Sequence, residues 1–396
     1  MKKIVKMVTL VLMLPVLAVS FAFNALAAVG DLSFFNMLTL SSGPKSFAGA
    51  AYDGRYVYYA PYDGTFFARY DTTRGFTASN AYSFSNTGGF NNASGQYLSA
   101  TAYNGYVYYA PYKSGVITRY NTARGFGNSA AWEFVDLSAL NPALVGFSQG
   151  VVVGNYMYFI PYNSAAYGYH SLIARYDTTK ALDSIGAWSI FDLSSLDPSY
   201  RGFTGGVSDG TNLYLIPNTI STSPTVVRSG KVLKYNTTGS FTWASSWSVF
   251  DMSTVNPNAK GYAFGTFDGR YMYLSPSVND TSFNGLVARF DTQGTFTNSA
   301  SWSFFDMATI NPNATVYAGA AYDGRYVTFS PALNGLIAQY DTTLPFTANA
   351  AWTFKDSAAI NANSTGFAGI VNAGNYDYFV PNNNGTSGQV TRLQVK

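Results

Sequence analysis

Seven prolines recur in the same local context along this chain: Pro61, Pro111, Pro161, Pro217, Pro276, Pro331 and Pro381. Their separations are 50, 50, 56, 59, 55 and 50 residues, and each closes a short aromatic run such as Tyr-Val-Tyr-Tyr-Ala-Pro at 56–61. Self-similarity at a period of this size indicates an array in which each unit is one supersecondary element. This period constrains the fold more strongly than any other feature of the sequence.

Each unit contains four short segments that read as β-strands. The first is rich in small residues and ends in Asp-Gly, Asn-Gly or Gly-Asn, which are typical of tight hairpin turns. The second is the aromatic run, and the third ends in a triplet such as Arg69-Tyr70-Asp71. The fourth carries Trp or Tyr and then Phe and Asp or Asn, as in 132–136. Four antiparallel strands per repeat indicate a β-propeller, with the small-residue strand innermost and the Trp strand at the outer edge.

The two ends of the chain complement each other. The last unit begins at Gly366 and ends at Lys396 after three strands, so its fourth strand is missing. Residues 33–37 (Ser-Phe-Phe-Asn-Met) match residues 303–307 (Ser-Phe-Phe-Asp-Met), which form a fourth strand. We therefore predict an all-β, seven-bladed propeller of four-stranded antiparallel blades, closed by the N-terminal strand, which removes exposed sheet edges. An open solenoid would not need complementary ends.

The predicted propeller domain covers residues 28–396. Residues 28–46 supply the outer strand of blade 7 and a linker, and the blades span about 47–96, 97–145, 146–201, 202–260, 261–315, 316–365 and 366–396.

The first residues have the pattern of a signal peptide. Lys2, Lys3 and Lys6 precede an apolar run, which ends in the small-x-small pattern Ala-Leu-Ala at 25–27. We expect cleavage after residue 27 and secretion to the extracellular space, the cell surface or the periplasm. No second apolar stretch reaches the ~20 residues of a membrane helix, so no membrane insertion is expected.

Low charge excludes some partners. The chain has 23 Lys and Arg against 20 Asp and Glu, and three of those lysines lie in the leader, so the remaining chain is balanced. A neutral surface without a basic run argues against nucleic acid. Aromatic residues make up 17% of the chain and charged residues 11%, so the surface depends on Tyr, Asn, Ser and Thr.

The unit resembles those of seven-bladed propellers of the YVTN, NHL and kelch kinds. Residues 58–72, Tyr-Tyr-Ala-Pro-Tyr-Asp-Gly-Thr-Phe-Phe-Ala-Arg-Tyr-Asp-Thr, have the strand–turn–strand cadence of the YVTN repeat of bacterial surface proteins. The Tyr-Val-Thr-Asn and Gly-Gly signatures of those families are not reproduced. The resemblance implies the architecture over the whole mature chain, whereas the role stays open because propellers include binding proteins, lectins and enzymes.

The residue inventory argues against common catalytic and metal sites. The chain has one His (His170), one Glu (Glu133) and no Cys, which excludes Cys nucleophiles, His-rich metal sites and paired catalytic Glu. His170 lies in an irregular polar loop, where a lone His is more often a surface residue than a catalytic one. Glu133 occupies a solvent-facing strand position. We expect no metal and no cofactor. A Ca²⁺ site near Asp280 or Asp197 is conceivable, but neither stretch has the dense oxygen-ligand spacing of an EF-hand-type loop.

Thirteen of the nineteen Asp residues occupy repeat positions, where they favour a structural role. Asp in the first hairpin turn, such as Asp53, is expected to adopt positive φ and to bond its own backbone. The Arg of the third strand is expected to pair with a carboxylate of its own blade. The Asp residues outside repeat positions are Asp31, Asp63, Asp183, Asp197, Asp280 and Asp377.

The functional hypothesis rests on departures from the repeat. The loop between the second and third strands is short in blades 1 and 2 and longer in blades 3 to 5, and insertions on one face of an array usually mark its binding face. The alternative is polar loops that grew at little cost. The candidate ligand-binding residues on this face are Tyr62, Tyr112, Tyr162, Tyr167, Tyr169, His170, Asn218, Asn279, Asp280 and Phe283.

Three functions are compatible with these features. The first is a secreted, non-catalytic module that binds carbohydrate or a cell-surface or extracellular protein, because Tyr and Asn offer flat apolar faces with neutral hydrogen-bonding groups. The second is a self-associating surface or matrix scaffold, which low charge and aromatic content favour. The third is an Asp-based polysaccharide hydrolase or lyase, which would need two non-repeat Asp residues to converge.

Overall fold

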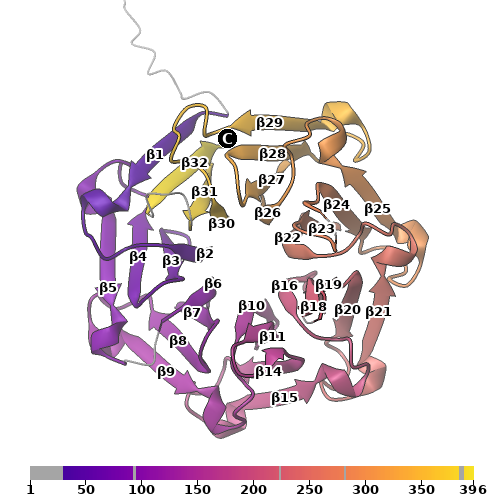
Figure 1. The fold of residues 1–396 in the computed structure, drawn as a ribbon. Coiled ribbons are helices and arrows are strands. Elements are labelled where there is room, and N and C mark those ends of the chain that lie inside the picture. Colours follow the sequence, from indigo (N-terminus) through magenta and orange to yellow (C-terminus); the bar gives the residue numbers. More distant parts are fainter. Residues whose placement is uncertain (1–29, 92–94, 223, 281, 383–387) are drawn as a thin grey trace, which may run out of the picture.

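The protein is described by a computed structural model covering residues 30–396 except 92–94, 223, 281 and 383–387. The expected signal peptide, residues 1–27, lies outside the described residues. Seven four-stranded antiparallel sheets surround a central axis like the blades of a propeller (Figure 1). The predicted fold class is confirmed.

The strand bounds follow the repeat. The innermost strands are β2 (Phe47–Tyr52), β6 (Tyr97–Tyr103), β10 (Phe147–Val153), β16 (Phe203–Ser208), β22 (Tyr262–Phe267), β26 (Tyr317–Tyr322) and β30 (Phe367–Ala373). The second strands are β3 (Tyr56–Pro61), β7 (Tyr106–Pro111), β11 (Tyr156–Pro161), β17 (Asn212–Pro217), β23 (Tyr271–Pro276), β27 (Tyr326–Pro331) and β31 (Tyr376–Pro381). The third strands are β4 (Phe66–Asp71), β8 (Val116–Asn121), β14 (Leu172–Asp177), β20 (Lys231–Asn236), β24 (Leu286–Asp291), β28 (Leu336–Asp341) and β32 (Gln389–Gln394).

The outer strands and their flanking 3₁₀ turns complete the blades. The outer strands are β5 (Tyr82–Asn86), β9 (Trp132–Asp136), β15 (Trp188–Asp192), β21 (Trp247–Asp251), β25 (Trp302–Asp306), β29 (Trp352–Asp356) and β1 (Leu32–Asn36). The 3₁₀ turns are η1 (Met37–Thr39), η2 (Ser79–Ala81), η3 (Thr87–Gly89), η4 (Ser129–Ala131), η5 (Leu137–Ala139), η6 (Ile185–Ala187), η7 (Leu193–Ser195), η8 (Ala244–Ser246), η9 (Met252–Thr254), η10 (Ser299–Ser301), η11 (Met307–Thr309) and η12 (Asn349–Ala351). No helix among the described residues has the length and apolarity to cross a bilayer.

Small residues occupy the innermost strands because the blades crowd together there. A Cβ added to Gly49 of β2 would lie 2.7 Å from Cα of Ser99 on β6, closer than two such atoms can approach. The strand order β2-β3-β4-β5 places the small-residue strand at the axis and the Tyr- or Trp-bearing strand outside (Figure 1). Both placements agree with the sequence prediction.

The ring closes through the two ends of the chain. β1 pairs antiparallel with β32 from Leu32↔Leu393 to Asn36↔Gln389, and the sheet order is β1-β32-β31-β30. Figure 1 shows β1 beside the C-terminal strands. Blade 7 therefore combines residues more than 330 positions apart in the chain.

The hydrophobic core is divided among the seven interfaces between neighbouring blades. The cluster between blades 1 and 2 shows the pattern: Tyr58 of β3 packs with Val107 of β7 and with Tyr120 and Phe126, which also belong to blade 2. Because each blade buries one face against each neighbour, no blade has a complete core of its own.

The turn Asp residues have the structural role predicted for them, with one difference. Oδ1 of Asp53 accepts hydrogen bonds from the backbone N–H groups of Arg55 and Tyr56, and Oδ2 accepts one from the hydroxyl of Tyr58 at 2.8 Å. The positive φ falls on the following residue, Gly54 (101°), because glycine has no Cβ to clash there.

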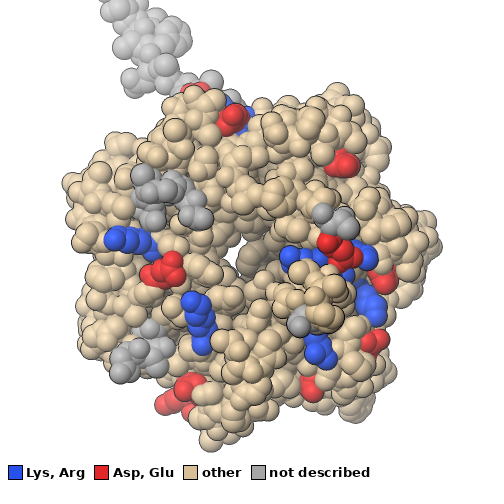
Figure 2. Space-filling model, viewed as in Figure 1, with Lys and Arg blue, Asp and Glu red and all other residues tan. Residues whose placement is uncertain are grey.

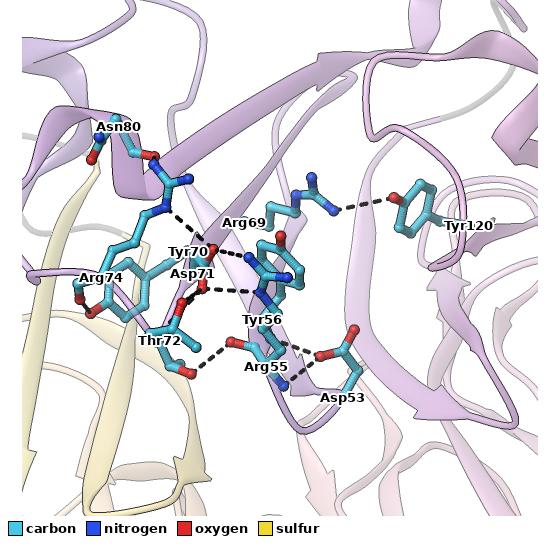
Figure 3. Close-up of polar contacts among 11 residues, drawn as sticks. Asp53, Arg55, Tyr56, Arg69, Tyr70, Asp71, Thr72, Arg74, Asn80 and Tyr120 are labelled. Atoms are coloured by element: carbon cyan, nitrogen blue, oxygen red, sulfur yellow. Dashed lines mark hydrogen bonds and ion pairs between the residues drawn. The ribbon is translucent and has the colours of Figure 1, made fainter.

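The prediction that the third-strand Arg pairs with a carboxylate of its own blade is wrong for Arg69 (Figure 3). Its guanidinium lies 4.1 Å from the ring centroid of Tyr56 and 4.8 Å from that of Phe126, and Nη1 donates to the hydroxyl of Tyr120 at 3.2 Å. The group is therefore held between aromatic rings of its own blade and the next one, where a cation is attracted to the ring faces. Arg119 does pair with a carboxylate, that of Glu133, at 2.7 Å.

The carboxylate at the end of the third strand pairs with a different arginine. Asp71 accepts from Nη2 of Arg55 at 2.8 Å, and Figure 3 shows this contact near Arg69 and Tyr56. The same pairing recurs in blade 6, where the Arg325 guanidinium lowers the pKa of Asp341 to about 2. These Asp residues therefore fix the hairpin of their own blade.

Candidate functional site: the long-loop face

The loops after the repeat prolines all join one face of the propeller. The backbone N–H of Tyr62 donates to the carbonyl of Ser46 in the linker that enters blade 1, at 2.9 Å. Tyr112 and Tyr162 make the equivalent bonds to Gln96 and Gly146, at 2.8 and 3.0 Å. These bonds attach each loop to the linker of its blade, so loops and linkers share a face, as the sequence predicted.

Four tyrosines form a continuous series on this face, which we call the tyrosine row: Tyr62, Tyr112, Tyr162 and Tyr169. The ring centroids of Tyr62 and Tyr112 are 5.9 Å apart and stacked, and those of Tyr112 and Tyr162 are 6.2 Å apart. The ring of Tyr169 meets that of Tyr162 edge-on at 5.7 Å. All four side chains are partly exposed. Burial is the main cause that raises the pKa of Tyr62, Tyr112 and Tyr162, so their hydroxyls stay neutral hydrogen-bonding groups.

The tyrosine row covers the three N-terminal blades. The residue after the proline is Tyr in blades 1 to 3 and becomes Asn218, Ser277, Ala332 and Asn382 in blades 4 to 7. The fourth ring, Tyr169, comes from the insertion in blade 3, a hairpin of β12 (Asn163–Ser164) and β13 (Gly168–Tyr169). The long loop thus extends the row by one ring.

Tyr167 and His170 have opposite environments in that same loop. Tyr167 stands at the tip and is 51% exposed. His170 is buried, its Nε2 is 2.9 Å from the carbonyl oxygen of Gly146, and its ring packs edge-on against Phe147. Burial lowers the pKa of His170, so the neutral ring donates Nε2–H to that carbonyl. His170 therefore anchors the base of the loop, in contrast to the surface position typical of a lone His.

Asn218 and Asp280 connect the loops of blades 4 and 5. The blade 4 loop contains β18 (Thr219–Ser221) and β19 (Val227–Arg228). Oδ1 of Asn218 accepts from Nη1 of Arg228 at 2.9 Å, and its Nδ2 donates to the carbonyl of Tyr262 in the next blade at 2.7 Å. Asp280 accepts from the backbone N–H of Arg228 at 2.6 Å and pairs with Lys260 at 2.9 Å. The two residues therefore fix the relative positions of the loops.

Phe283 separates two depressions at the edge of this face. One, of about 430 Å³, is lined by Val226, Arg228, Val278, Asn279, Asp280, Ser282 and Phe283. The other, of about 550 Å³, lies between Phe283 and Leu333. Oδ1 of Asn279 accepts from the backbone N–H of Ser282 at 2.9 Å and shapes the turn that presents Phe283, which is 61% exposed. Val226 and Leu333, which the sequence analysis missed, add exposed apolar surface.

The face as a whole carries few charges. In Figure 2 most of this face is uncharged, with side chains of both signs to the right of a narrow central opening and a few to its left. The cavity at the axis is about 130 Å³ and is lined mainly by Ala, Gly and Ser of the innermost strands, with Gln149 and Phe264. A small central space and a wide, neutral rim make the rim the larger surface for a ligand.

The ten predicted residues thus fall into three groups. The tyrosine row is a continuous aromatic surface, Tyr167 and Phe283 are exposed side chains of the long loops, and His170, Asn218, Asn279 and Asp280 hold those loops in place. Among the described residues, no group of three or more His, Cys, Asp or Glu could hold a metal ion. Asp197 and Asp280 are paired with different lysines, Lys231 and Lys260.

The comparisons with known proteins establish the fold. No protein-family model matches the sequence, and no curated protein matches it. A solved structure of virginiamycin B lyase from Staphylococcus aureus matches with a TM-score of 0.62 at 13% identity, over 92% of this chain and 99% of that one. Hydrazine synthase of Kuenenia stuttgartiensis matches with a TM-score of 0.58 at 12% identity, over 89% and 97%.

A third solved structure has the same architecture. The structure described as YCF48 bound to D1 peptide matches with a TM-score of 0.54 at 11% identity, over 93% of this chain and 96% of that one. At such identities the likeness shows the fold alone. The chain is therefore a seven-bladed β-propeller, and its function must be argued from its own residues.

Proposed function

We propose that this chain is a secreted, non-catalytic binding protein that recognises carbohydrate through the tyrosine row and the adjoining long loops. The observation that carries the proposal is the row itself: four partly exposed rings in sequence on one face. Aromatic side chains offer an apolar face and a polar tip, which suits the alternating C–H and hydroxyl groups of a sugar.

The surroundings of the row support a neutral ligand. The rim has few charges, and a tyrosine hydroxyl is neutral at physiological pH, with burial raising the pKa of Tyr162 further. The backbone of Tyr162 is fixed at the loop base, where its N–H donates to the carbonyl of Gly146 and its carbonyl accepts from the N–H of His170, both at 3.0 Å. A rigid aromatic surface loses little side-chain entropy on binding, which favours affinity.

The test compares two tyrosine variants on opposite faces. The wild-type protein is screened on a glycan array, and affinity for the best glycan is then measured by isothermal titration calorimetry. Y112A removes the second ring of the row and should weaken binding about tenfold, as expected from the loss of about 1.4 kcal/mol at an aromatic contact. Tyr103 lies at the hairpin end of blade 2, on the opposite face. Y103A should therefore bind the same glycan with an affinity within about twofold of wild type. Absence of any glycan bound by wild type would contradict the proposal.

A protein ligand is the second candidate, and one specific observation favours it. Phe283, Leu333 and Val226 expose apolar surface beside the two depressions in blades 4 to 6. Exposed aromatic residues at a depression are typical anchors of protein interfaces. If the array is negative and an envelope protein is captured by wild type but not by F283A, the ligand is a protein.

The scaffold and enzyme alternatives make different predictions. A scaffold should show a mass that rises with concentration in light scattering, whereas a binding module should stay monomeric. An Asp-based hydrolase or lyase should lose a detected activity in D63N or D280N. The folds of neighbouring enzymes do not favour this alternative, because the likeness extends to architecture alone.

A further inference from the structure

One interface departs from the other six in three repeat positions. The second strand carries a buried Tyr in six blades (Tyr58, Tyr108, Tyr158, Tyr214, Tyr273 and Tyr378) but Thr328 in blade 6. The third strand carries Arg or Lys in six blades but Gln339 in blade 6. The position just before that Tyr is apolar in six blades (Val57, Val107, Met157, Leu213, Met272 and Val327) but Asp377 in blade 7.

These three departures meet between blades 6 and 7. Thr328 pairs across the sheet with Gln339, whose Nε2 donates to the threonine hydroxyl at 3.1 Å. Burial is the main influence on the ionisation of Asp377, and two residues of the neighbouring blade add to it: Thr328 lowers its pKa and the charge of Asp323 raises it. Blade 6 therefore lacks the Tyr ring and the basic side chain of the other blades, and blade 7 adds a carboxylate at the same interface.

Two buried carboxylates at this interface each have one oxygen without a partner. Asp323 is 4% exposed, and its Oδ1 accepts from the backbone N–H groups of Arg325 and Tyr326. Its Oδ2 has no partner, because the Tyr hydroxyl that fills this role for Asp268, at 2.7 Å, is replaced by Thr328. Asp377 is fully buried, its Oδ1 accepts from Nδ2 of Asn372 at 2.8 Å, and its Oδ2 also has no partner.

A buried carboxylate oxygen without a partner lowers the stability of the folded state. A buried carboxylate is normally paired, neutralised by a proton or coordinated to a metal. Burial raises the pKa of Asp377 to about 7, and the charge of Asp323 adds to the shift. Lys396, at the exposed end of the chain, weakly opposes the shift but makes no described ion pair with either carboxylate.

The interface also has less apolar filling than the others. Its hydrophobic cluster contains five buried residues, Ile337, Phe367, Phe379, Leu393 and Val395, whereas each other interface has at least twelve. Leu393 stands where β4, β14 and β24 carry Tyr or Phe. Fewer rings at this position favour room for an ion and its water ligands.

We propose that the interface between blades 6 and 7 binds a small hard cation of the Ca²⁺ type through Oδ2 of Asp323 and Oδ2 of Asp377, with Thr328 close by. Carboxylate, hydroxyl and water oxygens are the ligands that Ca²⁺ takes, and it accepts irregular sets of them. The ion would join blade 6 to blade 7 and so strengthen the ring next to its closure, independently of any ligand on the loop face.

The test measures thermal unfolding of the full chain after treatment with a chelator. At pH 8, Ca²⁺ should raise the melting temperature of wild type by roughly 2–5 °C at a hundredfold excess over its Kd. The rise should shrink at pH 5, because protons then compete for Asp377, and calorimetry should give one ion per chain.

Two variants remove the site in different ways. D377V restores the apolar residue of the other blades, and T328Y restores the ring that covers the turn Asp, so both should abolish the Ca²⁺ response. D268N alters the equivalent turn Asp of blade 5 and should keep the response of wild type. The proposal is overturned if Ca²⁺ does not change the wild-type melting temperature at pH 8. In that case, stability that rises from pH 8 to pH 5 in wild type but not in D377V would identify a shared proton instead.

Discussion

At the scale of single residues, the propeller repeats a few polar contacts whose partners differ from blade to blade. The hydroxyl of Tyr273 donates to Asp268 at 2.7 Å, which leaves both oxygens of that carboxylate bonded. Tyr59, in the neighbouring position of β3, is equally buried, but its hydroxyl has no partner. The same residue type is therefore satisfied in one position and not in the other.

This contrast gives a prediction for two Tyr→Phe variants. Y273F should lower the free energy of unfolding by about 1 kcal/mol or more, because Oδ2 of Asp268 loses its partner in a buried place. Y59F should be neutral or slightly stabilising, because it removes an unsatisfied hydroxyl. Urea unfolding of both variants measures the difference, and equal losses would show that the Asp268 contact contributes nothing.

At the scale of the element, loop length is coupled to the residue before the innermost strand. That linker residue has positive φ in every blade, and it is Gly146, Gly202 or Gly261 where the loop is long. A Cβ on these glycines would lie 2.1, 1.8 and 1.9 Å from a carbonyl oxygen of the loop. Ser46, Gln96 and Val316 occupy the position where the loop is short. Glycine is needed here because the long loop lies directly against the linker.

The coupling predicts opposite effects at one position in two blades. G261A should destabilise the protein by more than about 1–2 kcal/mol, since it adds left-handed strain and displaces the carbonyl of Val278. S46G, in the same position before a short loop, should be neutral or stabilising by up to about 1 kcal/mol, because it relieves a positive φ of 52°. Chemical denaturation measures both. If G261A kept wild-type stability, the loop would be free to move away from the linker.

At the scale of the whole molecule, closure depends on one short strand. β1 completes blade 7 by pairing with β32, and its Phe35 stacks on Tyr82 of blade 1 with ring centroids 4.4 Å apart. The strand therefore pairs with the exposed edge of β32 and also packs against the first blade. The last blade is incomplete without it, and the first blade would lose the ring that stacks on Tyr82.

Deletion of residues 31–40 should therefore lower the melting temperature sharply and expose the edge of β32 to aggregation. F35A keeps the backbone pairing and removes the stacked ring, so its loss should be smaller, roughly 2 kcal/mol for a half-buried Phe. Calorimetry of the two variants, with light scattering for aggregation, tests the order of these effects. A harmless deletion would mean that the ring does not depend on closure.

Much of this architecture could be predicted from the sequence alone. The proline period gave the number of blades, the small residues identified the innermost strand, and the match of 33–37 with 303–307 predicted the closure. These features are visible because each blade has the same local environment, so the same residue type recurs at the same spacing. The placement of Tyr62, Tyr112 and Tyr162 on one face followed from the same regularity.

The tertiary structure decided the contacts between residues that are far apart in the chain. The aromatic cage of Arg69 depends on Phe126 of the next blade, and the anchoring role of His170 depends on Gly146, 24 positions away in its own blade. The unpartnered oxygen of Asp377 depends on what the neighbouring blade presents to it. A repeat pattern describes what each blade has in common, whereas these contacts depend on what its particular neighbour presents. The sequence therefore determined the ring and its order, and packing between unlike blades determined where charge, burial and exposed rings are found.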